Sequence, residues 1–309
     1  MDRHLQFRRA ASERGIPEDE ASTFAEFLRF AIWLSPHPTA GAPVGRYGGL
    51  PQLPVGMEWP SSRYGPLPFV VGFDCAALPR VDGLPMPADG SLLFFLHHEW
   101  AHEAFSVTGE QEFARVVYVP ADVGTTTAEE PEHGEEVFDN TELSFVGPEH
   151  DLYATVAAEL PGWFEDDDED EDEDTPSEGH EHLGLHLSHL EELCALVREL
   201  WPPGRGATVS LGGHSMDTGG LRTDHMFETP ETRMADDALR ARRQAGEPVV
   251  PPDERARQLE LEALRLMREW VPLAQFVPDD VHRGRFLIRR NDLAAGRFDK
   301  ALSFTAFTE

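Results

Sequence analysis

The alternation of apolar and polar positions divides the chain into short strands and a few amphipathic helices. Three runs rich in β-branched and aromatic residues, each bounded by Pro, Gly or Asp, predict strands over residues 69–73, 91–96 and 114–119. After Ser91 the second of these runs is continuously apolar, which indicates burial on both faces. Three further runs predict strands near the C-terminal end, over residues 273–276, 285–288 and 301–304.

The early and the late sets of strands resemble each other. In each set the first strand ends near an aspartate (Asp74 in one, Asp279 and Asp280 in the other), and a glycine precedes or opens the second strand. We interpret the sets as two candidate duplicated β units. The pattern leaves open whether the two units form one sheet or two.

Helical spacing of apolar residues predicts three helices. The first covers residues 18–34, and the third covers residues 253–270. Ser188 and Glu191 have the spacing of a capping box, which predicts that the second helix begins at Ser188 and ends before Pro202. Together these patterns predict an α+β fold: a mixed, largely antiparallel sheet flanked by helices, in a single domain over residues 1–309.

Charge changes this picture most. The 309 residues include 26 Lys and Arg against 57 Asp and Glu, a net charge of −31. A chain this acidic repels phosphate backbones, so we expect no nucleic-acid partner. Ten consecutive acidic residues, 165–174, cannot pack against one another, and we predict a disordered acidic loop over residues 165–178. The alternative is a specific acidic contact for a basic partner.

Cysteine content and hydropathy indicate the compartment. Two cysteines, Cys75 and Cys194, are too few for a secreted disulfide scaffold. The residues after Met1 lack the apolar core of a signal peptide, and no apolar run approaches the length of about 18 residues that a membrane span needs. We therefore expect a cytoplasmic protein without a membrane partner.

The segment from His98 to His102 matches the H-E-x-x-H pattern of zinc hydrolases. On a helix, His98 and His102 would share one face and hold one zinc ion, with Glu99 as general base. The segment follows a strand directly, without an N-cap residue before His97, and Phe105 stands where an extended motif has glycine. We therefore favour polar side chains at a strand exit and keep a zinc-dependent hydrolase as the alternative.

A second group of histidines lies close to the acidic run. His182, His186 and His189 have the spacing of one helical face and could form a weaker metal site, but Gly184 interrupts that helix. We favour exposed histidines beside the acidic run.

The segment from Gly213 to Asp217 is one residue short of the G-x-S-x-G nucleophile elbow. Asp217 replaces the second glycine, and Gly219 and Gly220 would break the helix that must follow. The sequence therefore does not favour a serine hydrolase of that class.

Several segments together resemble the YwqG-like family of bacterial proteins. The segments that carry the resemblance are Gly48-Gly49-Leu50-Pro51, Leu53-Pro54, Trp59-Pro60, Pro66-Leu67-Pro68-Phe69, Phe73-Asp74, Leu78-Pro79, Gly90 with Phe94-Phe95, Trp270, Leu273, Gln275-Phe276, Gly284 with Phe286-Leu287-Ile288, and Asp292-Leu293. Gly72 and His282-Arg283 depart from the family pattern, where a glutamine and a Trp-Asp pair are usual. The resemblance implies an α+β protein with a mixed sheet, and it implies no activity.

The net charge leads us to predict a non-enzymatic binding protein that docks a basic protein partner and needs no cofactor. The resemblance adds neutralisation of a toxin as one form of that role. A third hypothesis is a small-molecule pocket between the two β units, lined by Trp59, Asp74, Trp270 and Gln275.

Overall fold

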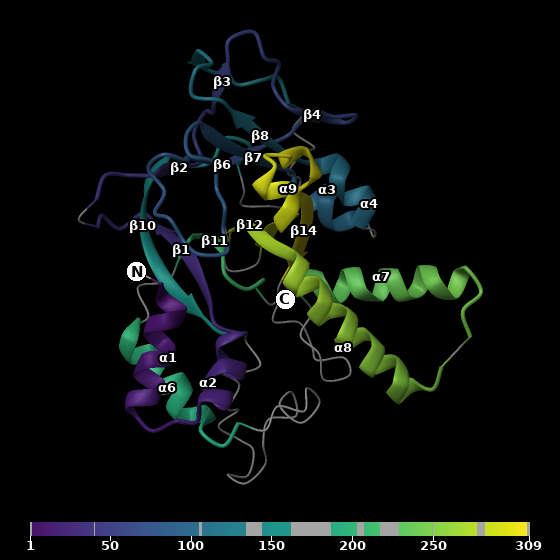
Figure 1. Cartoon of the computed structure of the whole chain (residues 1–309). Coiled ribbons are helices and arrows are strands. Elements are labelled where there is room, and N and C mark those ends of the chain that lie inside the picture. Colours follow the sequence, from purple (N-terminus) through teal and green to yellow (C-terminus); the bar gives the residue numbers. More distant parts are fainter. Residues whose placement is uncertain are drawn as a thin grey trace. The chain divides into compact units, whose positions relative to one another are not determined.

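A computed structural model describes most of the chain (Figure 1). The described residues are 2–39, 41–104, 107–133, 144–161, 187–202, 207–216, 229–248, 250–276 and 282–307. The predicted acidic loop, 165–178, lies outside them, as do His182 and His186. The chain separates into two compact units, which are described in turn. Unit 1 comprises Met1–Ala31, Val156–Arg205 and Gly212–Glu269, and unit 2 comprises Ile32–Thr155, Gly206–Leu211 and Trp270–Glu309.

Ten of the described strands form one sheet, whose spatial order is β14-β13-β12-β11-β1-β10-β2-β6-β7-β8. Along the chain these strands are β1 (Arg29–Ser35), β2 (Gly45–Tyr47), β6 (Phe69–Asp74), β7 (Ser91–Leu96), β8 (Ala114–Val119), β10 (His150–Glu159), β11 (Val209–Gly212), β12 (Trp270–Phe276), β13 (His282–Arg289) and β14 (Leu302–Phe307). Two short pairs stand beside it: β3 (Gln52–Pro54) with β9 (Thr125–Thr127), and β4 (Ser61–Ser62) with β5 (Gly65–Pro66).

The six predicted strands are present as two antiparallel meanders at opposite ends of this sheet. One meander is β6-β7-β8, and the other is β12-β13-β14. The two predicted β units therefore belong to one sheet, and the predicted α+β class with a largely antiparallel sheet is confirmed. The Phe94 ring on β7 meets the Phe286 ring on β13 edge to face, with centroids 5.2 Å apart. The sheet thus curls until its two ends face each other.

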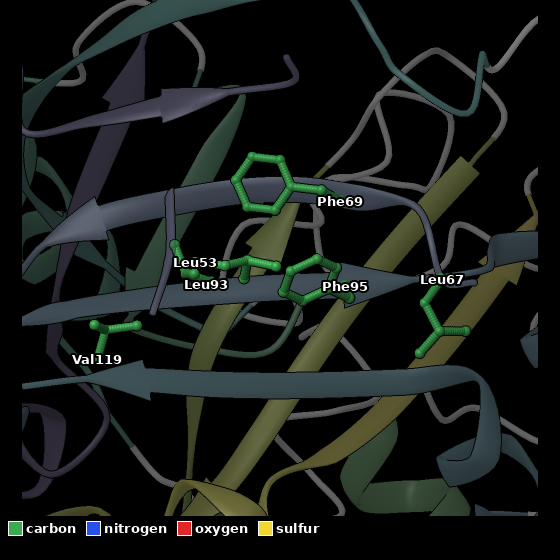
Figure 2. Packing of buried hydrophobic residues seen from close by; sticks show 6 residues of the cluster. All are labelled: Leu53, Leu67, Phe69, Leu93, Phe95 and Val119. Carbon is green, nitrogen blue, oxygen red and sulfur yellow. The ribbon is translucent and has the colours of Figure 1, made fainter. Parts of the chain in front are cut away.

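Apolar side chains from the first meander, from β3 and from the segment before β6 form a compact cluster in unit 2 (Figure 2). Its buried members are Leu53, Leu67, Phe69, Leu93, Phe95 and Val119. Leu93 and Phe95 are two residues apart on β7, so both side chains point to the same face of the sheet. The half-buried Trp59 packs edge-on against Phe95, at a centroid distance of 5.9 Å, and covers this cluster.

Short helices in unit 2 lie within the meanders, between the second and the third strand of each. They are α3 (His98–Glu103), α4 (Val107–Glu110), the 3₁₀ turn η1 (Gln111–Phe113), α9 (Arg290–Ala294) and the 3₁₀ turn η4 (Phe298–Lys300). Both α3 and α4 contact β14. Because β14 is an outermost strand of the sheet, these helices cover an edge that would otherwise offer unpaired backbone groups.

Unit 1 contains the longer helices. They are α1 (Arg3–Glu13), α2 (Glu18–Ala25), α6 (Leu190–Leu200), α7 (Pro230–Gln244) and α8 (Pro252–Glu269). α1 packs against α2 and α6, and the Phe7 and Phe24 rings stack at 5.4 Å. Among the helices that the structure describes, none combines the length and the apolar character needed to cross a membrane.

Two helix predictions need correction. The predicted helix over residues 18–34 is α2 followed by the strand β1, because the run from Phe30 to Leu34 is apolar throughout and satisfies both periodicities. The second helix, α6, has His189 as its N-cap residue rather than Ser188. The backbone N–H of His189 donates to Glu20 Oε2 of α2 at 3.0 Å, so a neighbouring helix supplies the acceptor. The predicted third helix is confirmed as α8.

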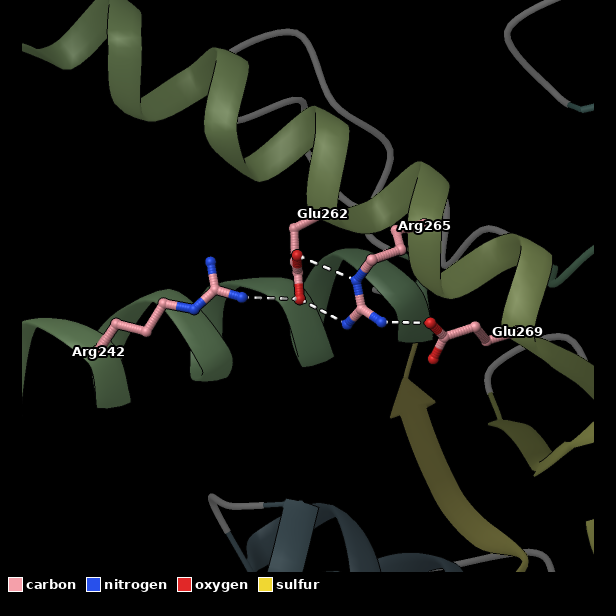
Figure 3. Close-up of polar contacts among 4 residues, drawn as sticks. All are labelled: Arg242, Glu262, Arg265 and Glu269. Atoms are coloured by element: carbon pink, nitrogen blue, oxygen red, sulfur yellow. Dashed lines mark hydrogen bonds and ion pairs between the residues drawn. The ribbon is translucent and has the colours of Figure 1, made fainter.

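Ion pairs join α7 and α8 into a helical hairpin (Figure 3). Glu262 of α8 accepts from Arg242 of α7 at 3.4 Å and from Arg265 at 2.7 Å, and Arg265 also pairs with Glu269. The hydrogen bond from Arg265 is the main reason that the pKa of Glu262 is lowered. The carboxylate of Glu262 is 9% exposed, so its two arginine partners compensate for its burial.

Candidate functional site

The H-E-x-x-H segment forms the short helix α3. Its N-cap is His97, whose Nδ1 accepts a hydrogen bond from the backbone N–H of Trp100 at 3.3 Å. The sequence shows no N-cap residue before His97, and in the structure His97 itself caps the helix, in the role that Ser, Thr, Asp or Asn usually has. The sequence offered no reason to assign this role to His97.

The two motif histidines lie in different surroundings. His98 is 7% exposed and packs edge-on against the Phe276 ring at 5.7 Å, whereas His102 is exposed and Glu99 is half-buried. Within the described part of the chain, no group of three His, Cys, Asp or Glu side chains is placed to hold a metal ion. The structure thus gives the zinc alternative no third protein ligand among the residues it describes.

Of the second histidine group, only His189 is described. Its Nδ1 lies 3.2 Å from Glu20 Oε2, the same oxygen that accepts its backbone N–H. This double contact ties the start of α6 to α2, which is a structural role.

The first two predicted pocket residues, Trp59 and Asp74, differ in exposure: Trp59 is half-buried and Asp74 is exposed. The indole Nε1–H of Trp59 donates to the carbonyl oxygen of Leu67 at 2.8 Å, which holds the ring against the core. Asp74 is exposed at the end of β6, and its Oδ1 accepts from the backbone N–H of Ala76 at 2.9 Å. Trp59 therefore serves packing, and Asp74 presents a carboxylate to solvent.

The other two predicted pocket residues lie at the two ends of β12. Trp270 is 6% exposed, and the Arg289 guanidinium lies over its ring at 5.2 Å. Gln275 is 1% exposed and donates to Ser210 Oγ at 3.4 Å. Each of the four residues has its own set of contacts, and a shared pocket stays a prediction.

Asp74 instead lies at an acidic end of the first meander, together with Asp89 and Asp122. In an antiparallel meander, the end of β6, the start of β7 and the end of β8 meet at one side, and the register pairs Asp74 with Ser91 and Ser91 with Val119. Asp89 precedes β7 and Asp122 follows β8. We call these three carboxylates the acidic sheet end. The ends of the predicted strands, paired as an antiparallel meander, would have located it.

The negative charge at the acidic sheet end contributes to raised pKa values of two neighbouring side chains, Tyr118 and Cys75. Burial, then the charge of Asp89, raises the pKa of Tyr118, whose hydroxyl donates to Asp89 Oδ1 at 3.3 Å. Burial, then the charge of Asp74, raises the pKa of the Cys75 thiol to about 12. Both shifts disfavour a further negative charge, as expected where carboxylates gather.

This potential gives a testable expectation for Tyr118. The substitution Asp89→Asn removes a charge that opposes formation of tyrosinate, so the pKa of Tyr118 should fall toward its ordinary value of 10.0. Ultraviolet absorbance during an alkaline titration measures tyrosinate, and the difference from a Tyr118→Phe variant assigns the transition among the four tyrosines. An unchanged Tyr118 transition in the Asp89→Asn protein would contradict the electrostatic account.

Comparison with known proteins identifies a family. The family model described as "Domain of unknown function (DUF1963)" matches residues 45–305, which is most of the chain and includes both meanders. No curated protein matches the chain.

Proposed function

The chain belongs to the DUF1963 family, whose function is not established, and from that premise we propose that it is a binding protein that docks a basic protein partner. The net charge of −31 carries this proposal. We further propose, from the low cysteine content and the hydropathy, that it acts in the cytoplasm. From the resemblance to YwqG-like proteins, we propose that toxin neutralisation is one form of its role.

The acidic sheet end supports this proposal with a specific surface. Asp74 and Asp122 are exposed, and the raised pKa of Tyr118 reflects, after burial, the negative charge of Asp89. Oriented charge of this kind increases association rates and selects partners of opposite sign more than it deepens affinity. Because salt screens exposed charges over about 8 Å at physiological ionic strength, docking should slow as salt is added.

The test begins with the full chain immobilised in lysate at physiological salt. A retained basic protein is identified by mass spectrometry, purified, and its association rate constant is measured at several salt concentrations. If no basic protein is retained, the proposed function is wrong. A retained protein supports it only if the purified pair associates with a rate that falls as salt rises.

A charge-matched pair of variants locates the docking surface. The triple variant Asp74→Asn, Asp89→Asn, Asp122→Asn keeps the side-chain shape and should slow association about tenfold at low salt. The control, Asp19→Asn, Glu192→Gln, Glu247→Gln, removes three exposed charges of unit 1 and should change the rate much less. Equal slowing in both variants would show that net charge alone acts and would remove the acidic sheet end from the proposal.

A further inference from the structure

A polar cluster in unit 1 begins where β11 ends in two left-handed glycines. Gly212 has φ 75° and Gly213 has φ 72°. A Cβ atom on Gly213 would lie 2.0 Å from Glu159 Oε2, so steric crowding also favours glycine at this position. The chain makes its sharp turn here, two residues before Ser215.

Hydrogen bonds on both sides of the turn fix its position. Arg29 donates to the carbonyl oxygen of Gly213 at 3.3 Å, and the backbone N–H of His214 donates to Glu159 Oε2 at 2.9 Å. The His214 ring is 8% exposed, and its Nε2 lies 2.7 Å from the carbonyl oxygen of Phe27. A carbonyl only accepts, so Nε2 carries a proton and the ring is oriented. Ser215 therefore follows an anchored backbone.

The next residue, Ser215, contacts a buried carboxylate. Its Oγ donates to Glu231 Oε1 at 2.7 Å. Ser215 is half-buried, whereas Glu231, in the first turn of the 15-residue helix α7, is 1% exposed. No group among the described residues donates a hydrogen bond to Glu231 Oε2, which is closed off from solvent. Among the described residues, the Ser215 hydroxyl is thus the donor that the structure shows for this buried carboxylate.

We propose that Ser215 is a nucleophile and that Glu231 is its general base, acting in acyl transfer from carboxylic esters. A hydroxyl within hydrogen-bond reach of an oriented base is the arrangement that activates serine. Ser215 is partly exposed, so a substrate can reach it from solvent, while the Glu231 side chain is buried, which strengthens the hydrogen bond between them. The activity is separate from the proposed docking function and involves other residues.

The chemical step balances within this pair. Ser215 Oγ forms a bond to the ester carbonyl carbon while its proton passes to Glu231 Oε1. The bond from that carbon to the alcohol oxygen breaks, and the alcohol leaves with the proton. Water then gives a proton to Glu231 and attacks the acyl carbon. The bond to Oγ breaks, Ser215 regains the proton, and a carboxylic acid is released.

The incomplete G-x-S-x-G pattern does not oppose this proposal. In that elbow the serine itself sits on the strained turn, so a side chain two residues later clashes. Here Gly212 and Gly213 make the turn before Ser215 is reached. The elbow's requirement for a second glycine therefore does not follow from this turn.

A fluorophosphonate probe tests the nucleophile without knowledge of the substrate. Its phosphorus accepts an activated serine oxygen, fluoride leaves, and the serine proton passes to the base. The full-length protein is labelled first and then digested with trypsin. Mass spectrometry of the peptides should find the adduct on Ser215 and none in Ser215→Ala. Glu231→Gln, which keeps the shape but cannot take the proton, should label about 10²-fold more slowly.

The control is Glu20→Gln, which alters another carboxylate of unit 1 and should label at the original rate. Melting temperatures establish that each variant is folded. If Ser215→Ala does not fold, Ser215→Cys replaces it and should react with iodoacetamide instead of the fluorophosphonate. The proposal is overturned if the native protein is not labelled, if the adduct lies elsewhere, or if a folded Glu231→Gln protein labels at the original rate.

Discussion

Replacing Gly48 with alanine is expected to lower the free energy of unfolding by about 3 kcal/mol. Gly48 has φ +64°, which costs an L side chain about 1–2 kcal/mol. A Cβ atom there would also lie 2.3 Å from the carbonyl oxygen of Pro148. That oxygen belongs to the backbone and cannot rotate away, and the N–H of Gly48 is already bonded to Val70 at 2.8 Å. Urea unfolding of the variant measures the loss.

Gly56→Ala is the matched control for this prediction. Gly56 is also left-handed, with φ +84°, but nothing lies within 4 Å of the Cβ position. Its substitution should cost only the backbone strain of about 1 kcal/mol. If the two variants lose equal stability, crowding by Pro148 is not what selects glycine at position 48.

The strands could be predicted because their signal is local. Each predicted run is apolar, β-branched or aromatic and ends at Pro, Gly or Asp, so the meander strands agree with the structure to within a few residues. The helix over residues 18–34 was wrong after Ala25, because an uninterrupted apolar run fits a helix and a doubly buried strand equally well. Pairing of β1 with β10 and β11 resolves that ambiguity, and both partners lie far along the chain.

The candidate sites likewise divide into one that local sequence predicts and others that depend on distant contacts. The acidic sheet end follows from predicted strand ends, since Asp74, Asp89 and Asp122 each flank a strand of one meander. Ser215 and Glu231 meet because the first turn of α7 packs beside Ser215. No spacing rule links a serine to a glutamate 16 residues later. The N-cap role of His97 depends on a histidine tautomer that composition does not encode.

Glu110 holds β14 across a sequence separation of 195 residues, and Glu110→Ala should lower the free energy of unfolding by about 3–5 kcal/mol. Glu110 is 0% exposed, and its Oε1 accepts from Ser303 Oγ at 3.2 Å and from Thr305 Oγ1 at 2.6 Å, as well as from the Thr305 N–H. Alanine would leave these buried donors without that acceptor, and each unsatisfied group costs about 1–3 kcal/mol. Urea unfolding measures the total.

Glu110→Gln separates the lost acceptor from the lost charge. Its amide oxygen can still accept from Thr305, so this variant should lose less stability than Glu110→Ala. The neighbouring Gln111 pairs its amide with both the N–H and the carbonyl of Ser303, at 2.7 and 3.0 Å, as another strand would.

Hydrogen exchange of residues 302–307 should therefore accelerate in Glu110→Ala before the rest of the sheet responds. Uniform acceleration across all strands would instead mean that α4 does not close this edge.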